Sequence, residues 1–274
     1  MEPLEKVVEN IKSVKVQGAK EIAIYALKFL RDFCRKNGFQ LKFEVAAMIL
    51  ERARPTAVVL HNCIAILMKN SSLKTIDLLL ERLEYSTRKI AKVGSKLIKN
   101  DYMIMTHCHS GEAMAVIKTA WKDGKKISVI ATETEPLEQG IKTVKELAKE
   151  KIPVTLITDN AVGHFMKDVD AVLVGADAIR IVPPFGVVNK IGTLNLAIAA
   201  KRYKKPLYVV GNTLKIDKRK KFVIEERPSI EVYRKIKGVK IRNPSFDLVS
   251  FPLITKIITE KGIYNSEKFR KIFR

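Results

Sequence analysis

Apolar residues in the first hundred positions recur at steps of three and four, which is the spacing of a single buried helix face. In residues 21–38 this spacing is kept by Ile22, Ala26, Phe29, Leu30 and Phe33. Asn37 and Gly38 then end the run, as expected at a helix C-terminus. Three further stretches, 43–54, 56–70 and 75–98, show the same periodicity. The pattern predicts a helical N-terminal domain over residues 1–100.

From Asp101 the pattern changes to short apolar runs, rich in β-branched residues, that alternate with amphipathic stretches. The predicted strands are 102–106, 127–132, 153–158, 171–175 and 206–210. The stretches between them are long enough to cross a sheet as helices, and an apolar segment at 251–262 predicts one more strand–helix or capping element. Continuous apolar strands joined by helices are typical of a parallel sheet covered on both faces. We therefore predict an α/β fold whose second domain, residues 101–274, is a doubly wound parallel sheet.

Composition restricts the class of protein. The chain has 274 residues, of which 47% are hydrophobic, so it can build packed cores and is not expected to be disordered. No apolar run approaches the roughly 18 residues of a membrane span, and the acidic N-terminus has no signal-type apolar core, so we expect a cytoplasmic protein. Cys34, Cys63 and Cys108 are odd in number and far apart, which excludes a disulfide framework and a CxxC motif.

The net charge of +22, from 51 Lys and Arg against 29 Asp and Glu, allows two interpretations. Strong positive charge is typical of nucleic-acid binders, whereas lysine enrichment is also typical of thermophile proteins. Half of the excess lies in residues 201–242, which hold 15 Lys and Arg and 4 Asp and Glu. The basic strip 215–242 is thus one candidate for RNA binding, and a solvated loop is the alternative, because the strip contains no aromatic-interleaved RNA motif of the kind that stacks bases.

Chemistry-bearing residues directly follow the predicted strands, where ligands gather in doubly wound folds. Cys108 lies between His107 and His109, just before a helix start whose dipole would lower the pKa of a thiol; the alternative is a small buried cysteine. The spacing of the two histidines predicts that they point in different directions, so no metal site is indicated. Asp177 follows the fourth strand. Burial there would raise the pKa of its carboxyl toward that of a general acid/base, and loop capping is the alternative.

Three further positions point to the same crevice. Gln139 and Gly140 follow the second strand and suggest close approach of a ligand. Asp159 follows the third strand, as a ligand contact or as a helix N-cap. Asn189 and Lys190 are predicted to begin a helix whose N–H groups form an anion site, and an ordinary cap with a surface lysine is the alternative.

The strings THCHSGEAMAVIKTAW, TETEPLEQG, IPVTLITDNAVGHFM, VLVGADAI and VVNKIGTLNLA, in this order, resemble one superfamily. It contains the regulatory alpha, beta and delta subunits of eukaryotic translation initiation factor 2B, their archaeal counterparts, and the isomerases of methylthioribose 1-phosphate and ribose 1,5-bisphosphate. The resemblance covers roughly residues 10–265. It implies a helical N-terminal domain, a Rossmann-like C-terminal domain, and a homodimer that is sometimes assembled into a hexamer.

The isomerase branch of the superfamily implies a complete catalytic site. Its catalytic cysteine and aspartate match Cys108 and Asp177. The implied reaction opens an aldose 1-phosphate and moves hydrogen between C1 and C2 to give a ketose, with these two groups as acid/base partners and no cofactor or metal. The resemblance assigns the remaining substrate contacts to Arg54, Gln139, Asn189 and Lys190.

Three departures favour the regulatory branch. Gln17 and Glu135 stand where the isomerases carry arginine, and Pro183-Pro184-Phe185-Gly186 replaces an Asn-Gly turn. Gln cannot make the charge-assisted bidentate bonds that arginine makes to phosphate. The compact length also resembles the alpha subunit. We therefore predict first an archaeal-type initiation factor 2B alpha-like regulatory subunit that binds initiation factor 2, with a sugar phosphate or nucleotide in its crevice. The isomerase is the alternative, and RNA binding the third hypothesis.

Overall fold

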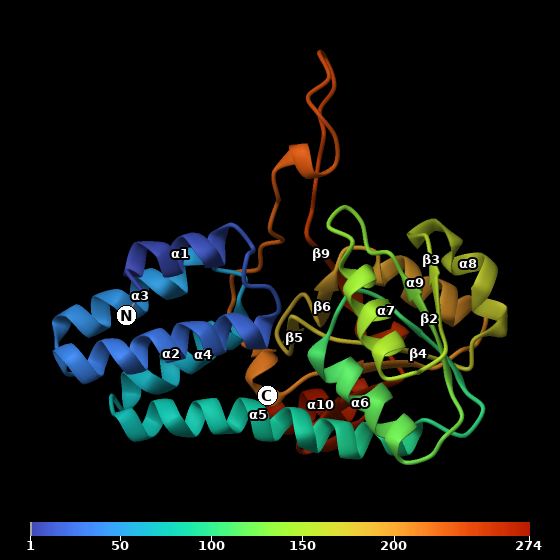
Figure 1. The fold of residues 1–274 in the computed structure, drawn as a ribbon, viewed down its shortest axis with the longest axis horizontal. Helices are drawn as coiled ribbons and strands as arrows, with labels where there is room; N and C mark the ends of the chain where they lie inside the picture. Colours follow the sequence, from blue (N-terminus) through green and yellow to red (C-terminus); the bar gives the residue numbers. More distant parts are fainter. Residues whose placement is uncertain (1) are drawn as a thin grey trace. The chain divides into compact units, whose positions relative to one another are not determined.

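The computed structural model describes residues 2–274, which form two compact units (Figure 1). The first unit extends to Ser86 and includes Leu214–Ile216, and the second comprises Thr87–Thr213 and Asp217–Arg274. The boundary falls within helix α5 (Leu73–Gly94). The division into domains at residue 100 stays a prediction.

The first unit is helical, as its periodicity predicted. It contains α1 (Leu4–Lys12), α2 (Ala19–Asn37), α3 (Leu41–Ala53), α4 (Val58–Lys69) and the first part of α5. Their apolar faces form one core, in which Leu30, Phe43, Leu60 and Leu67 are fully buried. The Asn62 side chain donates hydrogen bonds to the carbonyls of Leu214 and Ile216, at 2.8 and 2.9 Å, so the 214–216 segment is attached to α4.

The second unit is built on a seven-stranded sheet in the order β11-β10-β7-β4-β1-β2-β3. Its strands are β1 (Met103–Thr106), β2 (Ser128–Thr132), β3 (Val154–Ile157), β4 (Ala171–Val174), β7 (Leu207–Val210), β10 (Lys256–Thr259) and β11 (Gly262–Tyr264). All neighbours pair in parallel except β10 and β11. Without β11 this is the Rossmann strand order, which reverses direction between β1 and β4. The predicted fold class is confirmed.

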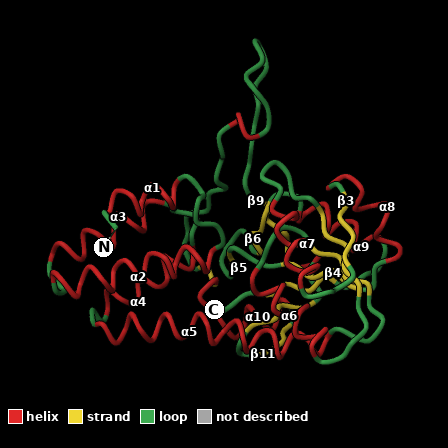
Figure 2. The backbone as a smooth tube through the Cα atoms, in the orientation of Figure 1, coloured by secondary structure: helices red, strands yellow, loops and turns green. Residues whose placement is uncertain are grey.

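The helices of the second unit are α6 (Gly111–Lys122), α7 (Gln139–Lys149), α8 (Val162–Phe165), α9 (Thr193–Arg202) and α10 (Ser266–Phe273) (Figure 2). One core includes Ile104, Val116, Ile117, Leu173 and Ile258, all fully buried, from α6 and the central strands. Within residues 2–274, no helix is both long and apolar enough to cross a membrane.

A second sheet of four strands, in the order β8-β5-β6-β9, was not predicted. It consists of β8 (Ile216–Asp217), β5 (Ala178–Arg180), β6 (Gly186–Lys190) and β9 (Phe246–Ser250). Asn189 and Lys190 pair with Asp247 and Phe246 in the antiparallel ladder of β6 and β9. The prediction that these two residues begin a helix is therefore wrong: they end a strand, and α9 begins at Thr193.

The basic strip 215–242 includes an arm that projects from the second unit, drawn in orange in Figure 1. Residues 225–227 pair with residues 243–245 at its base. Several cations of the strip are already buried or paired. Lys215 is 4% exposed, and ion pairs join Arg219 to Asp217, Arg227 to Glu231 and Arg242 to Glu226. These cations are thus engaged within the protein, whereas Lys218, Lys220 and Lys221 are exposed, and RNA binding by the strip stays a prediction.

Candidate functional site

The reversal of strand order between β1 and β4 brings Cys108 and Asp177 to the same edge of the sheet. Cys108 follows β1 and Asp177 follows β4, and both strands end at the same edge of the sheet because they are parallel. The Thr106 hydroxyl donates to the Leu173 carbonyl at 2.8 Å, which ties these two strand ends together. The two side chains are close enough for the Asp177 carboxylate to raise the pKa of the Cys108 thiol.

The backbone of Cys108 has a left-handed conformation, with φ of 66°. Its N–H donates to the Thr134 hydroxyl and its carbonyl accepts from the Thr143 hydroxyl, both at 2.9 Å. Non-glycine residues are rare in this conformation and persist where the surroundings hold them. The end of β2 and helix α7 thus fix the turn that presents the thiol.

The Cys108 thiol is protonated at neutral pH. Burial and, after it, the Asp177 carboxylate raise the pKa of Cys108 to about 12, while the His109 backbone and the Lys190 ammonium act in the opposite direction. The expectation of a lowered thiol pKa is therefore wrong, because the loss of solvent is the largest effect. A protonated thiol can donate a proton to a reacting group.

Lys190 and Asn189 lie at the end of β6 and are 7% and 5% exposed. Burial lowers the pKa of the Lys190 ammonium, whereas Cys108, Glu231 and Asp177 raise it. The Asn189 amide donates to the Thr193 hydroxyl at 3.0 Å, and this hydroxyl donates to the Lys190 carbonyl. Lys190 thus brings a cation to Cys108 and Asp177, and its contact with a substrate stays a prediction.

The predicted anion site at the start of α9 is already occupied by the protein itself. The Asp247 carboxylate accepts hydrogen bonds from the N–H groups of Gly192 and Leu194, at 2.8 and 2.9 Å. The carboxylate satisfies these two N–H groups of the helix N-terminus, so they are not free to bind a phosphate. Lys190 is the other part of the predicted anion site, and its ammonium is not involved in these hydrogen bonds.

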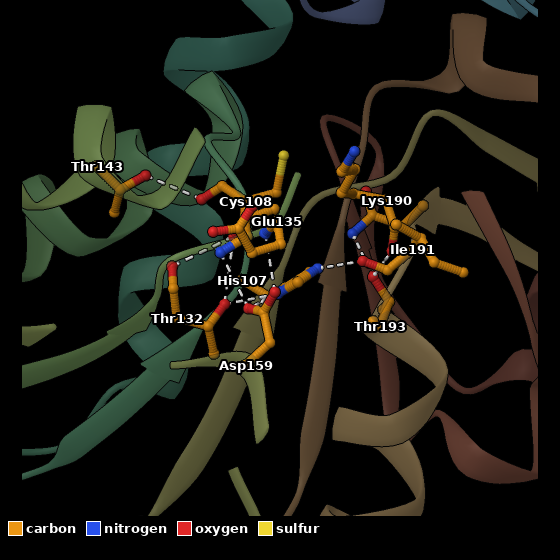
Figure 3. Close-up of polar contacts among 12 residues, drawn as sticks. His107, Cys108, Thr132, Glu135, Thr143, Asp159, Lys190, Ile191 and Thr193 are labelled. Carbon is orange, nitrogen blue, oxygen red and sulfur yellow. Dashed lines mark hydrogen bonds and ion pairs between the residues drawn. The ribbon is translucent and has the colours of Figure 1, made fainter. Parts of the chain in front are cut away.

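The two histidines beside Cys108 point in different directions, as predicted. His107 lies between Thr132 and the carbonyl of Ile191, at 2.6 and 2.7 Å from its two ring nitrogens (Figure 3). His109 contacts the Thr143 hydroxyl through Nδ1 at 3.0 Å. Within residues 2–274, no group of three or more His, Cys, Asp or Glu side chains could hold a metal ion.

The other predicted residues have different environments. Gln139 begins α7, and its Oε1 is buried with no hydrogen-bond partner in the described chain. The Asp159 carboxylate accepts hydrogen bonds from the N–H groups of Thr134 and Glu135, at 2.9 and 2.8 Å, and so holds the loop after β2. Arg54 lies in the first unit, at the C-terminal end of α3. Its contact with a phosphate stays a prediction.

Three threonines that hold the site were not predicted from the sequence. Thr132, Thr134 and Thr143 contact His107, the Cys108 N–H and the Cys108 carbonyl. A signal was available for the first two, because polar side chains at the end of a buried strand need partners. Nothing local indicated Asp247, which reaches α9 from a strand more than fifty residues further along the chain.

The replaced Asn-Gly turn has a structural explanation. The Arg180 guanidinium donates to the carbonyls of Pro183 and Pro184. The Phe185 ring packs under the guanidinium of Arg270, at 3.7 Å from its centroid. The change at 183–186 thus serves packing within the second unit and is no argument against catalysis.

Glu135, which stands where the isomerases carry arginine, is exposed. Partial desolvation together with Glu133 raises the pKa of its carboxyl.

Comparison with known proteins identifies similar sugar-phosphate isomerases. The chain is 40% identical to the ribose 1,5-bisphosphate isomerase of Archaeoglobus fulgidus over 282 residues, 96% of this chain and 90% of that protein. It is 37% identical to the methylthioribose-1-phosphate isomerase of Acetivibrio thermocellus over 300 residues, 94% of this chain and 87% of that protein.

Solved structures of both branches share the fold. The translation initiation factor eIF-2B of Pyrococcus horikoshii OT3 matches with a TM-score of 0.86 at 27% identity, covering 98% of this chain and 99% of that one. The 5-methylthioribose 1-phosphate isomerase of the same organism matches with a TM-score of 0.76 at 28% identity, covering 98% and 87%.

The prediction of a regulatory subunit that binds initiation factor 2 is wrong, because the curated relatives at 37 to 40% identity are isomerases of sugar phosphates. The prediction relied on the compact length and on changes in loops. These features describe the scaffold, whereas the reaction that a protein catalyses depends on the chemical groups of its site. The family model described as the Initiation factor 2 subunit family matches residues 15–266, and the chain belongs to that family.

Proposed function

We propose that the chain is an isomerase that converts an aldose 1-phosphate into the corresponding ketose phosphate. The observation that carries the proposal is the proximity of the Cys108 thiol, the Asp177 carboxylate and the Lys190 ammonium, which lie close enough to one another to change the pKa of the thiol and of the ammonium. The similar proteins named as isomerases of such sugars support it.

The proposed chemistry uses the thiol as the acid and the carboxylate as the base. Cys108 donates its proton to the ring oxygen as the bond from that oxygen to C1 breaks. Hydrogen then passes with its electron pair from C2 to C1, and Asp177 takes the proton of the C2 hydroxyl as the ketone forms. The Lys190 ammonium stabilises the thiolate that remains, since an opposite charge nearby favours an ionised group. The two protons balance, and Cys108 is reprotonated after release of the product.

The remaining predicted residues have binding roles in this proposal. The buried, unpaired Oε1 of Gln139 is suited to accept a hydrogen bond from a sugar hydroxyl after a small side-chain rotation. Asn189, held by Thr193, would orient the substrate beside Lys190. Arg54 would contact a phosphate, since a guanidinium matches phosphate oxygens in a bidentate way.

We propose a substrate class, the pentose 1-phosphates, and no single sugar within it. The similar proteins include isomerases of ribose 1,5-bisphosphate and of methylthioribose 1-phosphate, which differ in the group at C5. The former requires a second cationic contact, and Gln17 cannot supply it. An assay that presents both sugars in parallel decides between them.

The test measures ketose formation from each sugar by the wild type and by Cys108→Ser and Asp177→Asn. Loss of a positioned acid or base is expected to lower kcat by roughly 10²- to 10⁴-fold. Cys34→Ser and Asp168→Asn are matched controls, because Cys34 lies in the first unit and Asp168 is exposed, and both are expected to keep wild-type turnover. The proposal is rejected if the wild type forms no ketose from either sugar, or if both site variants match the controls.

A further inference from the structure

We propose that His107 is a positioning residue that fixes the turn carrying Cys108 against the turn that follows Lys190. The inference rests on the proposed isomerase function and assigns a role to a buried side chain that the chemistry above does not use. In Figure 3 the His107 ring lies between these two turns, which come from different strands.

The contacts of His107 define a single arrangement of its ring. The Ile191 carbonyl can only accept, so Nε2 carries the hydrogen and donates to it at 2.7 Å. In the neutral ring Nδ1 then accepts from the Thr132 hydroxyl, at 2.6 Å. The side chain is 2% exposed, and no solvent competes for either hydrogen bond. His107 thus links the end of β1 to the end of β2 and to the residue after β6.

The ring has no freedom to move away from this position. A Cβ added to Gly192 would meet the His107 Cε1 at 2.8 Å and the Nε2 at 3.0 Å, so the ring packs directly on that backbone. Residue 107 immediately precedes Cys108, and Ile191 immediately follows Lys190. The hydrogen bond from His107 to Ile191, here called the bridge, therefore joins the neighbours of Cys108 and Lys190, two side chains that must contact the same substrate. Loss of the bridge shifts the thiol relative to the ammonium.

Protonation of His107 is expected to change this arrangement. A protonated ring donates from both nitrogens, so the Thr132 oxygen becomes the acceptor of the Nδ1 hydrogen and its own hydrogen turns toward the Thr134 hydroxyl at 3.2 Å. The ring also gains a positive charge that the Lys190 ammonium opposes. Burial lowers the pKa of His107 below its usual 6.5, and so does the Lys190 ammonium, whereas the Asp159 and Asp247 carboxylates raise it. His107 is therefore neutral at neutral pH and becomes protonated only under acid conditions.

The test compares His107→Leu, which removes both hydrogen bonds, with His107→Gln, which keeps a donor for the Ile191 carbonyl. The exposed His164 provides a matched control, His164→Gln. Because a displacement of about 1 Å in a reacting group costs on the order of 100-fold in rate, His107→Leu is expected to lower kcat by that factor. KM is expected to change much less, and His107→Gln to recover most of the loss.

The pH profile separates positioning from a purely structural role. The wild type is expected to lose kcat in acid as His107 becomes protonated, at a pH below 6.5. His107→Gln cannot titrate and is expected to lack this acid limb, while His164→Gln keeps it. A variant that is only less stable would lower the amount of folded enzyme and leave the limb in place.

A second readout does not require turnover. The rate of Cys108 alkylation by iodoacetamide, assigned by peptide mass mapping, reports the thiol environment directly; Cys34 and Cys63 are buried and serve as internal references. His107→Leu is expected to react several-fold faster than wild type, and His107→Gln at the wild-type rate. If the wild type forms no ketose, the isomerase proposal fails and the alkylation series alone decides. The inference is overturned if a folded His107→Leu matches wild type in alkylation, or turns over with wild-type kcat.

Discussion

Replacement of Gly192 by alanine tests the coupling between His107 and the Lys190 turn from the opposite side. Gly192 has φ of 100°, and a Cβ there would lie 2.8 Å from the His107 ring, well inside van der Waals contact. The ring is held at both nitrogens and cannot retreat without losing a hydrogen bond. The substitution is therefore expected to affect both stability and turnover.

The magnitude has three contributions. A non-glycine residue in a left-handed conformation costs about 1–2 kcal/mol. Displacing the ring leaves a buried group of His107, Thr132 or Ile191 without its partner, which costs about 1–3 kcal/mol. Reduced freedom of the unfolded chain offsets about 0.4–1 kcal/mol. We expect a net loss of roughly 2–4 kcal/mol in the free energy of unfolding.

Gly124→Ala isolates the contribution of His107. Gly124 also has a positive φ, of 83°, but a Cβ added there meets nothing within 4 Å. Its variant therefore carries the backbone strain alone. Urea denaturation gives the free energy of unfolding of both variants, and ketose formation gives kcat. Equal stability loss and equal kcat in the two variants would refute the argument that the His107 ring is wedged against the Gly192 backbone.

Further predictions concern charged groups of the second unit. Arg180→Leu removes the fully buried partner of Asp217, which still binds Arg219, and we expect a loss of about 1–3 kcal/mol in urea denaturation, against less than about 1 kcal/mol for the exposed Arg242→Leu. Burial alone would raise the pKa of Asp217, but hydrogen bonds from Arg219 and the charge of Arg180 lower it below 3.8. The stability that this carboxylate adds is present above pH 3.8 and is lost as pH falls through the lower, folded-state pKa, so denaturation midpoints of wild type and Asp217→Asn should converge in strong acid. Asp247→Asn weakens the cap of α9, and we expect a loss of about 1 kcal/mol, measured in the same way.

The main sheet could be predicted because its signals are local. The five predicted strands each contain an observed strand, since continuous apolar runs are typical of parallel strands, and only the edge strand β3 is largely exposed. The second sheet could not be predicted. Strand β5 has three residues, and it precedes a turn with two prolines. Strand β6 pairs with β9, about sixty residues further along the chain, and such pairing depends on contacts that no window of sequence contains.

The site was predictable in outline for the same reason. Cys108 and Asp177 follow recognisable strands, so the reversal of strand order is enough to bring them together. The state of the thiol was not predictable, because its pKa depends on how completely the crevice excludes water and on the carboxylate opposite. The anion site assigned to α9 failed because Asp247, distant in sequence, supplies the cap. The positions of Cys108 and Asp177 could thus be predicted from the sequence, whereas tertiary contacts determine their charge and orientation.

The turn at Cys108 offers an argument for catalysis that is independent of sequence similarity. Both branches of the family share the fold, so the fold cannot separate a binding subunit from an enzyme. A left-handed cysteine, however, is a strained arrangement that costs of order 1–3 kcal/mol. Other non-glycine residues of the described chain share a positive φ, so the case for catalysis depends on the contacts that hold Cys108. Thr134 and Thr143 bind its backbone from both sides, and hydrogen bonds at both ring nitrogens anchor His107, the preceding residue. Contacts that over-determine a strained residue are characteristic of sites where a side chain must be presented in one geometry, and a proton-donating thiol beside Asp177 requires such a geometry.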